Sequence, residues 1–335
     1  MKPTDHISRL PRKLENNLSH LKASELQVWL LFYTLPCLQD FMSDCYLNHL
    51  ALFIEGIYVL LQDTITEQQL QHAKNVLNSF YQDFGILYGS NNYTLNMHNV
   101  CQHLVDYVRN LGPLWAWSCF PFEDMNGILL DSVHGTGDAC LQVLWAMQAQ
   151  KRLAIDTSLI LDADLRAYVE ENTKKVANCS VAGGLALQQY MDQSLTEKLK
   201  ILLKVETIGK ISKVQRVIVN NDIFFSKEYK RMEKRIGNVV LTDQDSGMAM
   251  AAIQYFIYHH ETNTCVAVVK KVSIKEDLPL VILNVNYLIR VENFENNNEL
   301  FVIPVDKIVE KVLYLSGNPK MLCIARLPNL YGQCC

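Results

Sequence analysis

The sequence is poor in the short patterns that identify common enzyme classes. Its ten cysteines never form a C-x-x-C pair, and their dispersion favours buried, reduced thiols over a disulfide framework. No G-x-S-x-G elbow occurs, and no spacing sets a nucleophile beside a base. The run from His134 to Asp138 has two glycines but not the P-loop pattern, so we expect a turn and a helix N-cap there. These absences argue against a hydrolase and a P-loop nucleotide enzyme.

Long apolar runs are missing as well. The longest apolar window, Leu50 to Leu61, is interrupted by Glu55 and is shorter than the roughly 18–20 residues that a membrane span needs. The first residues carry charges and two prolines where a signal peptide would have an apolar core. We therefore expect a soluble, intracellular chain with no membrane partner, and no pattern indicates a small-molecule substrate.

The composition is that of an ordinary globular protein. With 335 residues, 49% of them hydrophobic and 20% charged, the chain is long enough for two domains with real cores. The net charge is −4, and the charges are unevenly distributed along the chain. Residues 1–205 carry 15 Lys/Arg against 21 Asp/Glu, and residues 206–335 carry 16 Lys/Arg against 14 Asp/Glu. This balance argues against a general binder of polyanions, although a local basic patch could still contact phosphate.

The period of the apolar residues divides the chain into an α-helical part and a β-rich part. We expect a linker over residues 1–20, a mostly helical block over 21–155, a helical connector over 156–205 and a β-rich domain over 206–332. The connector contains two weakly helical pieces, Asp162 to Val176 and Leu185 to Lys204. Short runs of Val, Ile, Tyr and Phe separated by turns predict a small antiparallel barrel or sandwich. The predicted fold class is α+β.

Local signals set some of the helix boundaries. A helix that begins near Ser24 should end at Pro36. Thr66 and Gln69 form a capping box that should start a long helix, and Gly112-Pro113 should stop a later one. The aromatic cluster that follows is more typical of core packing than of a base-stacking platform, because no Lys or Arg is interleaved. Its members are Trp115, Trp117, Phe120 and Phe122.

Two histidines form the first pattern that indicates chemistry. His98 and His103 are spaced H-x4-H, which lies within the range of zinc sites. In one regular α-helix, residues five apart lie about 140° apart around the axis, so the imidazoles face one ion only if His98 lies in a frayed start or a preceding turn. Thr94 is a suitable N-cap for such a start. Two unrelated helical histidines are the alternative.

Four stretches of the sequence carry a resemblance to a known family: KASELQVWLLFYTLPCLQD (Lys22 to Asp40), YLNHLALFIEGIYVLLQDTIT (Tyr46 to Thr66), HLVDYVRNLGPLWAWSCFPFE (His103 to Glu123) and DSVHGTGD (Asp131 to Asp138). They resemble the C-terminal part of animal transposases of the CACTA (En/Spm) group. The resemblance covers residues 11–150, with a weaker similarity in the β-rich part.

The resemblance implies roles for three residues. In that group, and in the related V(D)J recombinase, an H-x4-H pair precedes the last acidic residue of a DDE triad. Here nineteen residues separate His103 from Glu123. The resemblance therefore implies that Glu123 is the last triad carboxylate and that His98 and His103 form half of a Cys-Cys-His-His zinc site.

The sequence departs from the family where catalysis is concerned. A DDE site needs two Asp and one Glu to hold two metal ions, and the chain begins after the region where those Asp are expected. We therefore expect a partial site for Zn²⁺, and Mg²⁺ only if the missing carboxylates are supplied. Glu123 has an alternative interpretation as an ordinary carboxylate in a first helical turn that Pro121 begins, where the helix dipole stabilises it.

A basic stretch in the second half is a candidate nucleic-acid contact, although a solvated face is the usual meaning of such a run. It comprises Lys227, Lys230, Arg231, Lys234 and Arg235. The sequence as a whole favours a transposase-derived fragment that is inactive alone, with residual DNA or protein binding, and the resemblance favours a nuclear location. The alternatives are a protein-interaction module without a nucleic-acid role, and the truncated gene product of a complete DNA transposase.

Overall fold

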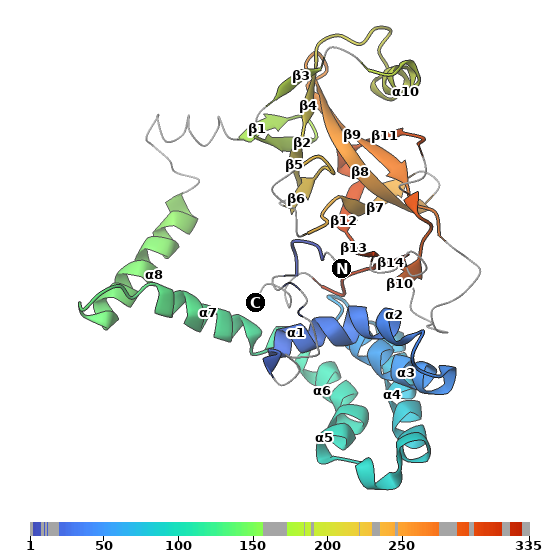
Figure 1. Cartoon of the computed structure of the whole chain (residues 1–335). Coiled ribbons are helices and arrows are strands. Elements are labelled where there is room, and N and C mark those ends of the chain that lie inside the picture. The colour runs from blue at the N-terminus through green and yellow to red at the C-terminus, as the bar shows by residue number, and fades with distance from the viewer. Residues whose placement is uncertain are drawn as a thin grey trace.

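The chain folds into a helical part and a β-rich part (Figure 1). The computed structural model describes residues 3–7, 10, 12, 20–156, 173–183, 185–188, 191–220, 222–229, 235–244, 247–274, 287–294, 298–316 and 322–329. The α+β class is confirmed. The sheets are antiparallel and open over these ranges, so the expectation of a barrel or sandwich was too specific.

Helices account for most of the described chain up to residue 156. The α-helices are α1 (Ala23–Val28), α2 (Thr34–Leu38), α3 (Asp44–Leu60), α4 (Glu67–Tyr88), α5 (Leu95–His98), α6 (Leu104–Leu111), α7 (Phe120–Asp131) and α8 (Ala139–Asp156). Wider π-helical turns are η2 (Trp29–Tyr33) and η4 (Asn99–His103), and tighter 3₁₀ turns are η3 (Ser90–Asn92) and η5 (Leu114–Trp117). Within the described ranges, none of the helices has the length and apolar character needed to cross a bilayer.

The capping box at the start of α4 forms as the sequence predicts. The Gln69 N–H donates to the Thr66 hydroxyl at 3.3 Å, and the Thr66 N–H donates to the Gln69 side-chain oxygen at 2.8 Å. These bonds satisfy backbone donors that the first helical turn leaves open. Gly112, with φ of +90°, follows the last residue of α6, as expected for a glycine that ends a helix.

Pro36 does not end the first helical segment. It lies inside α2, which continues to Leu38. The chain accommodates it because the preceding turn, η2, is π-helical: the N–H and the hydroxyl of Thr34 both bond to the carbonyl of Trp29, five residues back. A wider turn moves the backbone away from the position where a proline ring would clash.

The strands form three antiparallel sheets. One has the order β1-β2-β5-β6, another β10-β14-β13, and the largest β11-β9-β8-β4-β3 with β7 and β12 added beside β8. The smaller two sheets consist of β1 (Thr173–Val176), β2 (Cys179–Ala182), β5 (Arg216–Val219), β6 (Asp222–Phe225), β10 (Leu288–Arg290), β13 (Leu313–Ser316) and β14 (Leu322–Ala325). The largest consists of β3 (Ala186–Gln188), β4 (Ile211–Val214), β7 (Val239–Gln244), β8 (Gly247–His259), β9 (Thr264–Lys271), β11 (Phe301–Pro304) and β12 (Ile308–Lys311); α10 (Gln193–Leu203) and the 3₁₀ turn η8 (Val305–Lys307) complete the fold.

The helical connector predicted for residues 156–205 is partly wrong. Thr173–Val176 and Ala186–Gln188 are strands, and only α10 in this region matches the second predicted helix. β1 pairs with β2, β2 pairs with β5, and β3 pairs with β4. Partners that lie farther along the chain thus convert weakly helical segments into strands. Residues 157–172 lie outside the described ranges.

The helical and β-rich parts share a hydrophobic core. Side chains of α1–α3 pack with those of β13 and β14 in one buried cluster. The rings of Tyr58 and Tyr287 stack with their centroids 3.8 Å apart, and the Tyr287 hydroxyl donates to the Leu31 carbonyl at 3.3 Å. The Asn329 amide donates to the Leu61 carbonyl at 2.6 Å. The packing therefore continues from the helical part into the β-rich part.

The N-terminal residues expected to form a linker also join this core. Ile7 is 1% exposed and belongs to the cluster of α1–α3. The carbonyl of Pro3 accepts a hydrogen bond from the Ile236 N–H at 2.9 Å. The carboxylate of Asp5 lies 2.7 Å from the ammonium of Lys311 on β12. Residues 3–7 are thus held by the β-rich part.

Candidate functional site

The histidine pair lies on a helix that is locally wider than an α-helix. His98 is the last residue of α5, and His103 is the last residue of the π-helical turn η4. The Met97 N–H donates to the Thr94 hydroxyl at 3.2 Å, which confirms Thr94 as the N-cap. A π-helical turn bonds residues five apart and places them on nearly the same side of the axis. The two imidazoles can therefore face one ion, which the angle of about 140° between residues five apart in a regular α-helix would prevent.

The two imidazoles face each other at a distance that suits two ligands of one metal ion. Their Nε2 atoms lie 3.2 Å apart, and the ring planes cross at 75°. Two nitrogens bound to one tetrahedral zinc at about 2.0–2.1 Å are about 3.3 Å apart. The Tyr81 hydroxyl lies 3.4 Å from Nδ1 of His98 and orients that ring with Nε2 toward His103. The pair fits two corners of a zinc tetrahedron.

The other two corners are not supplied by the described part of this chain. No group of three or more His, Cys, Asp or Glu side chains within these ranges could hold a metal ion. Cys101 lies between the histidines in sequence, but its side chain is 1% exposed and faces the core. Burial raises the pKa of the Cys101 thiol to about 11, which disfavours the thiolate that zinc binds. The described residues thus offer two of the four ligands that a tetrahedral zinc site would need.

Glu123 lies in the first turn of α7, as the sequence predicts. Its N–H donates to the Cys119 carbonyl at 3.0 Å, and its side chain is exposed. Among the residues that the structure describes, no hydrogen bond or ion pair joins its carboxylate to another side chain, including those of His98 and His103. The position suits a metal-binding carboxylate and a helix-dipole carboxylate equally, so its catalytic role stays a prediction.

α7 and α8 present an exposed apolar surface. In Figure 1 they extend away from the other helices as an arm. The prediction that the aromatic cluster anchors a core is wrong for Trp117 and Phe122, which are 40% and 71% exposed, whereas Trp115 packs against the core of α1–α3. The large apolar side chains exposed on the arm are Phe122, Met125, Ile128, Leu130, Leu141, Leu144, Trp145 and Met147. Large apolar side chains are exposed along both helices of the arm.

The predicted nucleic-acid contact falls only partly on described residues. Lys230, Arg231 and Lys234 lie outside the described ranges. Lys227 is exposed in the turn after β6. Arg235 has a structural contact, because its guanidinium donates to the carbonyls of Thr4, at 2.9 Å, and Ile7. Contact of this stretch with phosphate stays a prediction.

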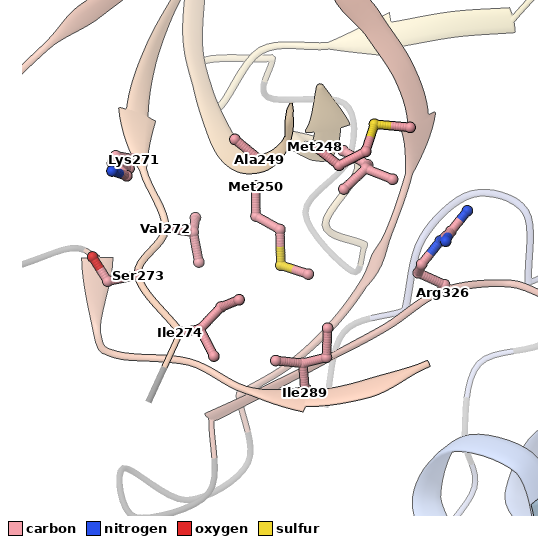
Figure 2. Close-up of a pocket in the computed structure, with 10 residues that line it drawn as sticks. Met248, Ala249, Met250, Lys271, Val272, Ser273, Ile274, Ile289 and Arg326 are labelled. Carbon is pink, nitrogen blue, oxygen red and sulfur yellow. The ribbon is translucent and has the colours of Figure 1, made fainter. Parts of the chain in front are cut away.

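A pocket that the sequence does not indicate lies on the β-rich part. Its volume is about 530 Å³, and side chains from β7, β8, β10 and the end of β9 line it (Figure 2). Met248, Met250 and Ile289 contribute to an apolar wall. Two cations, Lys271 and Arg326, flank it. Arg326 bonds to Glu310 at 2.6 Å, whereas Lys271 has no ion pair within the described ranges.

Models of known protein families and curated protein sequences give no match to this chain. The side chains and their geometry therefore carry the functional inference, together with the resemblance in the sequence. The histidine pair was found from its spacing. The pocket has no such signal, because its lining comes from segments far apart along the chain.

Proposed function

We propose that this chain is the C-terminal part of a CACTA-type DNA transposase and that it does not cleave DNA alone. It supplies two imidazoles to a zinc site and one carboxylate to a DDE triad. Two thiolates and two aspartates come from a polypeptide segment outside this sequence. The observation that best supports the proposal is the 3.2 Å approach of His98 Nε2 to His103 Nε2 across a π-helical turn.

The two kinds of metal have different roles in this proposal. Zn²⁺, held by His98, His103 and two thiolates, would tie the helix that carries the histidines to the segment that carries the thiolates. Mg²⁺ would be held by Glu123 together with the missing aspartates, since hard cations take carboxylate oxygens. One carboxylate cannot hold the two ions that DNA cleavage needs. The proposed location is the nucleus, where the DNA is.

The exposed arm supports the idea of a missing partner. Phe122 and Leu130 on α7, and Trp145 on α8, are between 65% and 74% exposed. Side chains of this size stabilise a protein only when another surface removes them from water. Glu123 lies at the base of the same arm. A segment that covers the arm could therefore also bring aspartates toward Glu123.

Zinc binding by the untagged full chain tests the half-site. We expect weak binding of Zn²⁺ or Co²⁺, because two ligands give much lower affinity than four, and a gain when a small dithiol supplies two sulfurs. His98→Ala and His103→Ala should each abolish the gain, and His134→Ala, at an exposed histidine elsewhere, should not. Unchanged metal content in the double variant of His98 and His103 would end the zinc proposal.

DNA binding by the full chain is a separate test, and the shared core argues against using the β-rich part alone. We expect weak, salt-dependent binding that is lost when Lys227, Lys230, Arg231 and Lys234 become alanine. Arg235 is left intact because it holds residues 3–7. Absence of binding at low salt would remove the DNA-binding part of the proposal.

Nuclease activity gives the third test. Supercoiled DNA incubated with the chain and Mg²⁺ or Mn²⁺ should remain unnicked. Nicking that disappears in Glu123→Gln but not in Glu67→Gln, an acidic residue in the first turn of α4, would show a complete active site. That result would contradict the proposal that the chain does not cleave DNA alone.

The pocket supports a second candidate function, an interaction module that binds a protein segment. Its apolar wall and Lys271, which has no ion pair among the described residues, suit a short extended segment with apolar and acidic side chains. A labelled peptide of alternating leucine and aspartate should bind, and Lys271→Glu should weaken binding by about tenfold. Lys307→Glu, on η8, is the control. Equal binding by both variants would rule out the pocket as the site.

A further inference from the structure

Two cysteines from different sheets meet in the β-rich part. Cys179 is the first residue of β2, and Cys265 is the second residue of β9. The side chain of Asn178 bonds to both backbone groups of Cys265: it accepts from the N–H at 3.0 Å and donates to the carbonyl at 2.8 Å. The Ala177 N–H also donates to the Asn263 carbonyl at 2.9 Å. Three hydrogen bonds thus hold the two backbones side by side.

The two side chains lie near each other. Cys179 and Cys265 are both free cysteines, and the neighbouring Cys179 side chain helps to raise the pKa of the Cys265 thiol. Both side chains pack in the cluster that contains Val217 and Phe256. A disulfide has an S–S distance of about 2.05 Å, and rotation of the two side chains about χ1 would have to bring the sulfurs to that distance.

Burial makes the two thiols unequal. Cys265 is 0% exposed, whereas Cys179 is only partly buried. Of the two residues, Cys179 is therefore the one that a dissolved oxidant can approach. An accessible thiol next to a second, resolving thiol is the arrangement of redox-sensitive cysteine pairs.

We propose that Cys179 and Cys265 form a redox-sensitive pair that glutathione disulfide converts into an intramolecular disulfide. The Cys179 thiolate attacks one sulfur of the oxidant, which forms a mixed disulfide and releases one glutathione thiolate. The Cys265 thiolate then attacks Sγ of Cys179, which breaks the mixed disulfide and releases the second glutathione. The protein loses two protons and two electrons, and the oxidant becomes two thiols.

The first step makes the second easier. The neighbouring Cys179 side chain, followed by burial, holds the pKa of the Cys265 thiol well above its ordinary range. When Cys179 becomes a mixed disulfide, it is no longer a thiol, so this effect and the repulsion from a Cys179 thiolate both end. Burial still raises the pKa of the Cys265 thiol. The disulfide should therefore form faster at higher pH, where more of this thiol is ionised.

The disulfide would join β2 of the four-stranded sheet directly to β9 of the largest sheet. It lies apart from the histidine pair and from Glu123, so it is independent of the proposed transposase origin. In a reducing compartment the pair stays as thiols, and an oxidising shift would cross-link the two sheets.

The test uses the reduced full chain treated with glutathione disulfide at pH 7 and pH 8.5, followed by non-reducing digestion and mass spectrometry. The wild type should yield a peptide cross-linked between Cys179 and Cys265, several-fold faster at pH 8.5. Cys265→Ser should instead accumulate a glutathione adduct at Cys179, and Cys179→Ser should leave Cys265 unmodified. Cys140→Ser, at an exposed cysteine on α8, should cross-link like the wild type.

A wild-type measurement covers the case in which Cys265→Ser does not fold. Iodoacetamide should alkylate Cys179 in the reduced native chain and neither cysteine of the pair after oxidation. A stable glutathione adduct at Cys179 of the wild type without the cross-link would overturn the proposal. So would modification of Cys265 at the wild-type rate in Cys179→Ser.

Discussion

At the residue scale, Lys311 is a buried charge with two acidic partners. Its side chain is 1% exposed, and its ammonium lies 2.7 Å from Asp5 and 2.9 Å from Asp222. A buried charge is tolerated only when it is paired, and the two carboxylates provide the pairing. Because Asp5 belongs to residues 3–7 and Asp222 to β6, the lysine joins the N-terminal segment to two strands.

Lys311→Met is expected to destabilise the protein by about 3 kcal/mol, because it leaves two carboxylates close together without their cation. The value lies at the low end of the range for broken buried pairs, since both carboxylates retain some contact with water. Urea unfolding of the full chain measures the change. Lys307→Met, on the neighbouring turn η8, should change the free energy of unfolding by less than about 0.5 kcal/mol.

Asp222 should make stability depend on acidic pH. Burial alone would raise the pKa of its carboxyl, but the nearby imidazole of His6 and the hydrogen bond from Lys311 outweigh burial and lower the pKa below its ordinary value of 3.8. A lowered pKa means that the contribution to stability is present above 3.8 and is lost as pH falls through the folded-state pKa. The Tm of the wild type should exceed that of Asp222→Asn by roughly 2 °C at pH 6. The difference should shrink as pH falls through the folded-state pKa; a constant difference would contradict the assignment.

At the element scale, α3 and α4 approach closely at Gly56. A Cβ atom at this position would lie 2.6 Å from Cγ of Leu77, a side chain that is 0% exposed. Leu77 cannot move toward solvent, so a methyl group forces the two helices apart. A glycine inside a helix is otherwise unfavourable, and here the close packing accounts for it.

Gly56→Ala should therefore destabilise the protein by about 1–3 kcal/mol, in spite of the higher helix propensity of alanine. The matched control is Gly127→Ala on α7, where the added Cβ meets nothing within 4 Å. The control should stabilise the chain by up to about 1 kcal/mol. Thermal unfolding followed by circular dichroism measures both, and equal signs for the two changes would contradict the close approach of α3 and α4.

At the scale of the whole molecule, the shared core should make the helical and β-rich parts unfold together. All four tryptophans lie in the helical part, at positions 29, 115, 117 and 145, so tryptophan fluorescence reports on that part alone. Amide hydrogen exchange in β8 and β9 reports on the other. Coupled parts give coincident transitions by different probes.

Tyr58→Ala tests this coupling, because Tyr58 is 4% exposed and stacks on Tyr287 across the junction. We expect a loss of about 3–5 kcal/mol that lowers the fluorescence midpoint and the protection of β8 and β9 amides by similar amounts. Phe53→Ala, at a partly buried ring of the helical part, is the control. A lower midpoint of the fluorescence transition, with unchanged hydrogen-exchange protection of the β8 and β9 amides, would show two independent units.

Local sequence patterns predict those parts of the molecule that depend on neighbours in the chain. The capping box at Thr66 starts α4, Gly112 ends α6, and the Val- and Ile-rich runs become strands such as β8 and β9. In each case the residues that make the structure lie within one turn or one strand of each other. The α+β class and the pair His98 and His103 follow from such short-range patterns.

Features that depend on distant partners emerge only when the chain is folded. The sequence predicts helix for β1 and β3, which form strands because they pair with β2 and β4. It predicts a linker for residues 3–7, which are held in place by contacts with Lys311 and Arg235. The turn η4, which brings the imidazoles together, has no known spacing signal, and Cys179 meets Cys265 only through sheet packing. The physical reason is that residue type sets local preference, whereas burial and pairing with remote segments decide between conformations of similar local free energy.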